Sequence, residues 1–227
     1  MGLFVALSGV IGASADDVQG ALKAFAASRA GSFESTAGMP GEPNTGSITQ
    51  YGVNTTVMYP EGFSEWYDAS SFLSANLEKP VFSLHIHDED LWMYILFRGG
   101  DEIGCFNPIP DYWEELAPEE RARWKGDAEI IAGVVPGLTP AAVSNYLIEW
   151  TPQQQGGVRA YPDDEFQIGD SWQMCDFMRK IGLEYPMGGE STSAGQSFTM
   201  VVSDEAQPLE EVAAAVEPAA KPWWKIW

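Results

Sequence analysis

The chain has 227 residues, and 33 Asp and Glu against 12 Lys and Arg give it a formal charge of -21. This length predicts one compact domain, or one domain with an appendage. The 45% hydrophobic and 12% aromatic content argues against wholesale disorder, which requires low hydrophobicity as well as high net charge. The acidity disfavours nucleic acid and anionic membranes as partners, because both are bound largely through Lys and Arg. A basic protein surface or a divalent cation remains compatible with it.

The first part of the chain supports two interpretations. An apolar start that ends in Ala-Ser-Ala at 13–15 imitates a signal-peptide cleavage site, but no Lys or Arg precedes it. The favoured interpretation is a strand over 3–11, followed by a helix that Ser14 caps and that ends near Gly31.

The next segments alternate between a loop, a strand and a helix. Residues 35–50 are rich in Gly, Ser, Thr and Pro, which predicts a loop. Residues 53–59 are rich in Val, Thr and Tyr, which is typical of a strand. Apolar residues at helical spacing predict a helix over 64–78, and Pro80 prevents its continuation.

Three consecutive strands are predicted next, over 81–87, 91–98 and 102–107. Short runs of turn residues, at 88–90 and 99–101, separate them. The simplest topology for such a series is a β-meander.

The pattern becomes helical beyond Pro110. Pro118 is placed as a first-turn residue, and Thr139 with Pro140 predicts the cap and first position of another helix over about 139–150. A last helix is predicted from Asp170 or Ser171 to Gly182.

The element order therefore predicts an α+β fold. It comprises a mainly antiparallel sheet, ferredoxin-like in element order and extended by the meander, with helices on one face, then a helical half and a C-terminal tail. Residues 1–186 are expected to form the globular domain, sheet-rich over 1–110 and helical over 111–186. Residues 187–203 are expected to be a linker with one possible further strand, over 198–202.

Residues 204–227 have the composition of an acidic tail with an aromatic, basic end. The last seven residues hold three of the nine tryptophans, and large rigid rings are enriched where proteins bind one another. The tail is therefore predicted to be a docking peptide for a protein partner. Two alternatives are that it folds back onto its own domain, or that it lies at a membrane interface. The predicted contact residues are Trp223, Trp224, Lys225 and Trp227.

Both histidines of the chain lie in the first strand of the meander, at alternate positions that share one face. If the hairpin turns at Glu89-Asp90, the facing strand adds two aromatic residues, and the candidate ligand face is His85, His87, Trp92 and Tyr94. The same histidines could bind a metal ion with a neighbouring carboxylate, which gives the candidate ligands His85, His87 and Asp88. The alternative is that the histidines are half-buried structural residues of the sheet.

No nucleophile elbow, Cys/His pair or phosphate-binding glycine loop occurs in the sequence. Cys105 and Cys175 have no metal or redox spacing and fit a reducing cytoplasm. The sequence thus favours a non-catalytic cytoplasmic interaction protein, adaptor or inhibitor-like, that binds a protein partner, which could be basic. Nucleic acid is not expected as a partner, a membrane is disfavoured, and no cofactor is expected. The alternative is a metal-dependent hydrolase or metal-binding protein that uses His85 and His87.

Overall fold

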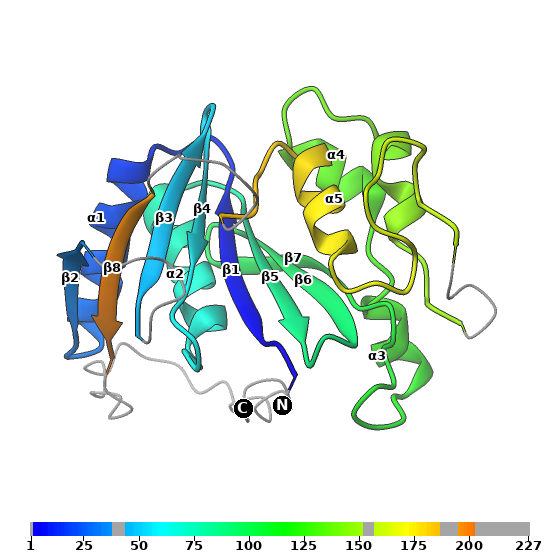
Figure 1. The fold of residues 1–227 in the computed structure, drawn as a ribbon, viewed down its shortest axis with the longest axis horizontal. Coiled ribbons are helices and arrows are strands. Elements are labelled where there is room, and N and C mark those ends of the chain that lie inside the picture. Colours follow the sequence, from blue (N-terminus) through cyan, green and yellow to red (C-terminus); the bar gives the residue numbers. More distant parts are fainter. Residues whose placement is uncertain (1, 38–43, 152–156, 187–194, 203–227) are drawn as a thin grey trace, which may run out of the picture.

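The computed structural model describes residues 2–37, 44–151, 157–186 and 195–202. Its eight described strands form one antiparallel sheet, in the order β2-β8-β3-β4-β1-β5-β6-β7 (Figure 1). The α+β fold expected from the sequence is confirmed. The elements are β1 (Val5–Val10), α1 (Ala15–Ser28), β2 (Ser32–Thr36), β3 (Gly46–Tyr51), β4 (Asn54–Met58), α2 (Trp66–Leu77), β5 (Val81–His87), β6 (Leu91–Arg98), β7 (Asp101–Phe106), α3 (Pro118–Arg123), α4 (Ala128–Val134), the 3-10 turns η1 (Pro140–Ala142) and η2 (Ser144–Tyr146), α5 (Gln173–Lys180) and β8 (Gln196–Val201).

The two longer helices, α1 and α2, pack together on one face of the sheet. The Ser14 hydroxyl accepts a hydrogen bond from the Asp17 amide at 3.2 Å, so the predicted cap of α1 is confirmed. On the buried side of α1, Val18, Leu22 and Phe25 repeat at helical spacing. In this layer α1 contacts β2 and β3, and α2 contacts β1, β5 and β6.

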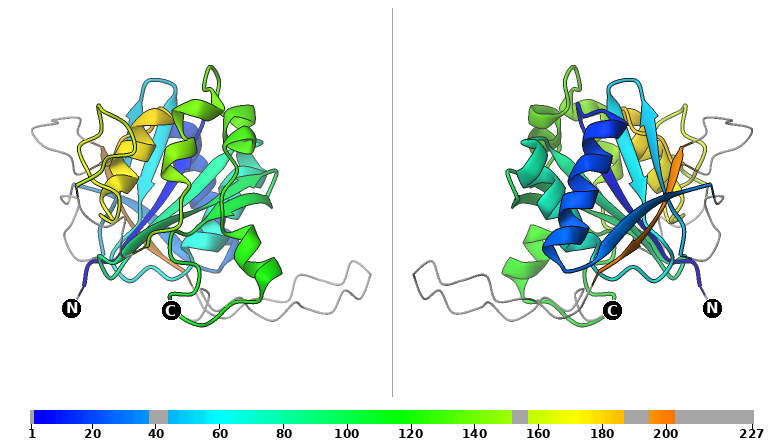
Figure 2. Two further views of the ribbon diagram at one scale, coloured as in Figure 1. Left: turned by 90° about the vertical axis from the view of Figure 1, so that its right-hand side faces the viewer. Right: turned by 90° about the vertical axis from the view of Figure 1, so that its left-hand side faces the viewer.

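The other face of the sheet is covered, over β5 and β6, by the segment that follows β7. Phe177 of α5 contacts Phe82, Trp92 and Tyr94, with ring centroids 5.1–6.1 Å apart. The two views of Figure 2 show α1 and α5 on opposite sides of the sheet. The sheet is therefore the middle layer of this part of the molecule.

Two sequence predictions outside the meander are wrong. The predicted loop at 35–50 contains the last two residues of β2 and all of β3 except Tyr51, and the predicted helix over 139–150 is the pair of 3-10 turns η1 and η2. Val143 and Tyr146, three residues apart, are both fully buried there, which fits the three-residue period of a 3-10 turn.

The further strand expected at 198–202 exists as β8, and it is an interior strand of the sheet. It pairs with β2 on one side and with β3 on the other. The predicted docking peptide at 221–227 lies outside the described residues. Within the described residues, no helix has both the length and the apolar character needed to cross a bilayer.

Candidate functional site

The β5–β6 hairpin is the element that carries both histidines, and its register differs from the expected one. His85 pairs with Met93, and His87 pairs with Leu91, because the connection holds three residues, 88–90, instead of two. Asp88 and Glu89 both adopt the left-handed conformation, with φ of 53° and 62°. A change of one residue in register moves the whole facing strand to the opposite side of the sheet.

The predicted ligand face is consequently divided between the two sides of the sheet. His85 and His87 share the side of α2, whereas Trp92 and Tyr94 face α5 and are fully buried. Trp92 donates a hydrogen bond from Nε1 to Gln173 at 3.3 Å, and the Tyr94 ring stacks on Phe177. The two aromatic residues are core residues, and the predicted four-residue face is wrong in this respect.

The His85 imidazole lies almost entirely out of water. It stacks on Trp66 with ring centroids 5.0 Å apart, and its Nδ1 atom is buried without a hydrogen-bond partner among the described residues. Burial, with a smaller contribution from the nearby His87, lowers the pKa of His85 to about 3. His85 is therefore a neutral, flat and mostly apolar surface at physiological pH.

His87 is half-buried and lies 5.8 Å from His85, measured between ring centroids. Its ring packs edge-on against Phe4 and Trp113, at centroid distances of 4.8 and 4.9 Å. Burial lowers the pKa of His87, and the charges of Asp88 and Asp90 oppose that shift. Both imidazoles thus belong to an aromatic cluster.

A pocket of about 650 Å³ opens beside these rings, at the end of the sheet where the central strand β1 begins and its neighbour β5 ends. This volume lies within the range of small-molecule sites, about 300–1,000 Å³. Its described aromatic lining residues are Phe4, Tyr59, Phe63, Trp66, His85, His87, Trp113 and Tyr185.

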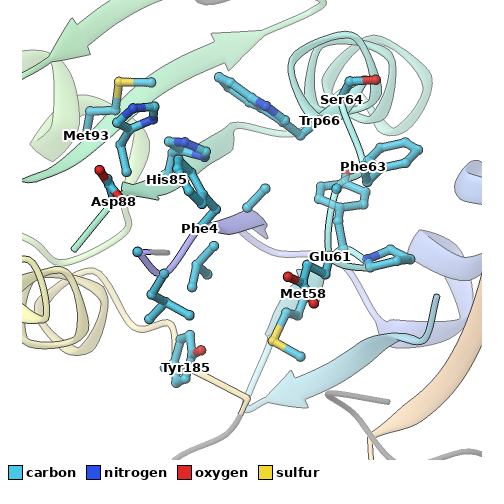
Figure 3. Close-up of a pocket in the computed structure, with 18 of the residues that line it drawn as sticks. Phe4, Met58, Glu61, Phe63, Ser64, Trp66, His85, Asp88, Met93 and Tyr185 are labelled. Carbon is cyan, nitrogen blue, oxygen red and sulfur yellow. The ribbon is translucent and has the colours of Figure 1, made fainter. Parts of the chain in front are cut away.

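In the close-up view, the labelled side chains surround the pocket on four sides. Phe4, His85 and Asp88 lie on one side, and Phe63, Met58 and Glu61 lie on the other, with Trp66 above and Tyr185 below (Figure 3).

One wall of the pocket, the segment between β4 and α2, is held by a buried chain of hydroxyl groups. Tyr59 Oη and Ser70 Oγ both lie 2.7 Å from Ser8 Oγ on β1. Ser70 also donates to the Trp66 carbonyl at 2.8 Å, and Phe63 stacks on Tyr59. Burial raises the pKa of Tyr59, so its hydroxyl stays protonated and can donate. The wall is therefore fixed to the sheet and to α2.

The charge of the pocket is negative. Glu61 and Asp88 are its acidic lining residues, and no Lys or Arg is among the described residues that line it. Since both histidines are neutral, nothing in this lining compensates for the two carboxylates. A cation placed over the aromatic faces would be attracted both by the ring quadrupoles and by the acids.

The predicted metal site is only partly reproduced. His85, His87 and Asp88 all line the same pocket. Across the part of the chain that the structure describes, however, no group of three His, Cys, Asp or Glu side chains is arranged to hold a metal ion.

Most of the pocket was not foreseen from the sequence. The stretch from Tyr59 to Tyr67 places four aromatic residues around a Pro-Glu-Gly loop, and this density was the available signal. Tyr185 and Trp113, by contrast, come from segments whose position depends on the long-range packing of the helical half.

Comparisons of the chain with protein-family models, with curated proteins and with solved structures found no match. The function is accordingly argued from the pocket and from the sequence.

Proposed function

We propose that the chain is a non-catalytic interaction protein, adaptor or inhibitor-like, whose pocket binds an apolar or aromatic group that carries a positive charge. The observation that carries this proposal is the lining: aromatic rings with two carboxylates, Glu61 and Asp88, and no basic side chain among the described residues. Neutral histidines that pack against other aromatic rings support a binding surface rather than a proton-transfer site.

The proposed ligand class can be tested with two small probes that share an indole ring. Tryptamine carries a positive charge, whereas indole-3-propionate carries a negative charge. We expect tryptamine to raise the melting temperature and indole-3-propionate to leave it unchanged. A ligand present at ten times its Kd stabilises by about 1.4 kcal/mol, which corresponds to roughly 3–6 °C for a chain of this size.

The titration is made on the wild-type chain and on a full-length variant with Trp223→Ala, Trp224→Ala and Trp227→Ala. Equal effects of the two probes, or no effect of tryptamine on either protein, would refute the proposed ligand class. A Glu61→Lys variant localises the effect: its response to tryptamine should be weaker, because the exposed Glu61 carboxylate lines the pocket.

The C-terminal segment supports a second interaction, with a protein partner. Trp223, Trp224, Lys225 and Trp227 remain the proposed contact residues on the strength of composition, because they lie outside the described residues. Pull-down with the wild-type chain and the triple Trp→Ala variant tests this. Proteins captured by the wild type alone would support it, and identical captures would contradict it.

A cytoplasmic location is part of the proposal. Cys105 and Cys175 are both free, and burial raises the pKa of each thiol to about 12. Free thiols are compatible with a reducing compartment. The metal-dependent alternative remains testable by metal analysis of the purified protein: a stoichiometric transition metal that is lost on replacing His85 and His87 would support it.

A further inference from the structure

We propose that the occupant of the pocket is the chain's own C-terminal peptide, residues 221–227, so that the protein carries an internal ligand for its own binding site. This inference rests on the proposed function of the pocket. It also gives the pocket a regulatory role, because an external ligand must displace the peptide before it can bind, and the peptide must leave the pocket before it can bind a protein partner.

The first support is the position at which the described chain ends. Gly46, at the start of β3, pairs with Phe198 of β8, and Thr45 beside it lines the pocket. β8 runs toward the same end of the sheet as the start of β1 (Figure 1). Three strand spacings, about 14 Å in all, separate β8 from β1.

The second support is the length of the connection. Twenty-one residues, 202–222, lie between the end of β8 at Val201 and Trp223. Fully extended, a chain of that length spans at most about 69–76 Å, several times the separation across the sheet. The peptide can therefore reach the pocket of its own chain without extending fully.

The third support is chemical complementarity. The pocket is lined by aromatic rings and two carboxylates, with no Lys or Arg among its described residues. The peptide carries three indole rings and two of the chain's twelve basic residues, Lys221 and Lys225. Indole rings can stack on the aromatic walls, and the ammonium groups can lie near Glu61 and Asp88.

The tether strengthens this association. Covalent connection makes binding of the peptide an intramolecular event, for which effective local concentrations can reach the millimolar range. If the free peptide binds with a Kd of about 10 μM, a tethered peptide at about 1 mM makes the pocket roughly 100-fold less accessible to a competitor. A weak complex would thus be almost fully formed within one chain.

The test adds the peptide Lys-Pro-Trp-Trp-Lys-Ile-Trp, with a fluorophore at its N-terminus, to two full-length proteins. One is the wild type, and the other is the variant with Trp223→Ala, Trp224→Ala and Trp227→Ala. Fluorescence anisotropy should show binding to the triple variant and at least tenfold weaker binding to the wild type. A peptide with Ala in place of its three Trp residues should not bind.

A charge reversal locates the site. In the triple variant, Glu61→Lys should weaken peptide binding about threefold or more, since it reverses an exposed acid of the pocket. Glu129→Lys is the matched control, because it changes the net charge by the same amount at a distant place. Glu129 lies on α4, at the top of Figure 1, whereas β1 begins at the bottom. This control should leave binding unchanged.

Three results would overturn the inference: no binding to the triple variant at 1 mM peptide, equal binding to both proteins, or no effect of Glu61→Lys. If tryptamine still stabilises the triple variant in any of these cases, the proposed function stands and the internal ligand alone fails. Sedimentation of the wild type should show a monomer. A dimer that the Trp→Ala changes dissociate would mean that the peptide binds a second copy.

Discussion

At the scale of single residues, the burial of His85 makes the free energy of unfolding depend on pH. Its pKa is lowered to about 3 in the folded chain, against 6.5 in the unfolded chain, mainly by burial. Between these values the unfolded state binds the proton and the folded state does not, so the free energy of unfolding falls as the pH falls from about 6.5. Below about pH 3 both states are protonated and this contribution no longer changes.

His85→Phe should remove that dependence while it keeps a flat ring on Trp66. One proton taken up on unfolding corresponds to a slope of about 1.4 kcal/mol per pH unit. The slope of unfolding free energy against pH between 5 and 6, measured by urea denaturation, should therefore be smaller in the variant by about that amount. Equal slopes in the two proteins would show that His85 is already protonated when folded, or accessible to water.

Asp176 of α5 is a second residue with a large expected effect. Its fully buried carboxylate accepts hydrogen bonds from the backbone amides of Glu165 and Phe166 at 2.8–3.1 Å, and it pairs with the guanidinium of Arg179. It therefore fixes the loop before α5 to that helix. Removal of this acceptor leaves two amides unpaired, at about 1–3 kcal/mol each.

Asp176→Ala should lower the free energy of unfolding by about 2–6 kcal/mol in urea titrations. Asp163→Ala is the control, since Asp163 is exposed and pairs with Lys180 at the surface. The free energy of unfolding of this control should be close to that of the wild type. Comparable losses in the two variants would contradict the role assigned to Asp176.

At the scale of elements, β8 is the strand that joins the edge strand β2 to the rest of the sheet. β2 pairs with β8, and β8 in turn pairs with β3. Phe198 of β8 is fully buried and stacks on Phe33 of β2, with ring centroids 4.9 Å apart. The strand expected from the sequence within the segment 187–203 is thus an interior strand of the sheet.

Phe198→Ala should cost about 3–5 kcal/mol in the free energy of unfolding, as is usual for a large buried ring. Val201→Ala, at an exposed position of the same strand, serves as control and should cost less than about 0.5 kcal/mol. A loss below about 1 kcal/mol for Phe198→Ala would indicate that β8 is dispensable for the domain.

The elements also show how far the sequence was informative. The bounds of β5 and β6 were predicted as observed, because both are long apolar runs with clear turn residues between them. The pairing register was not, since a three-residue connection with two left-handed acidic residues resembles a two-residue turn in sequence. That single residue decided whether Trp92 and Tyr94 joined the histidines.

The strands β2 and β3 illustrate a second limit. Their sequences are rich in Ser and Thr and carry little alternation, so local preference alone is weak. They become strands because each pairs with β8, across about 150–170 residues of chain. The pocket shares this limit, because its lining comes from seven separate segments of the sequence.

At the scale of the whole molecule, the charge of -21 opposes compaction. Salt screens this repulsion: the Debye length falls from about 30 Å at 0.01 M to about 8 Å at physiological ionic strength. The melting temperature should therefore rise by about 2 °C or more between 10 mM and 300 mM NaCl. KCl should act equally, and a fall in melting temperature with salt would mean that attractive ion pairs dominate.

Because β8 is an interior strand from the late part of the chain, the sheet stays incomplete during most of synthesis on the ribosome. β2 is synthesised early, but the strand that pairs with it emerges about 160 residues later. At roughly 5–20 residues per second, β2 waits for roughly 8–30 s without its neighbour. During that interval β3 exposes an unpaired edge, and such edges attract other chains. Completion of the sheet, and with it protection from aggregation, depends on the last described strand of the chain.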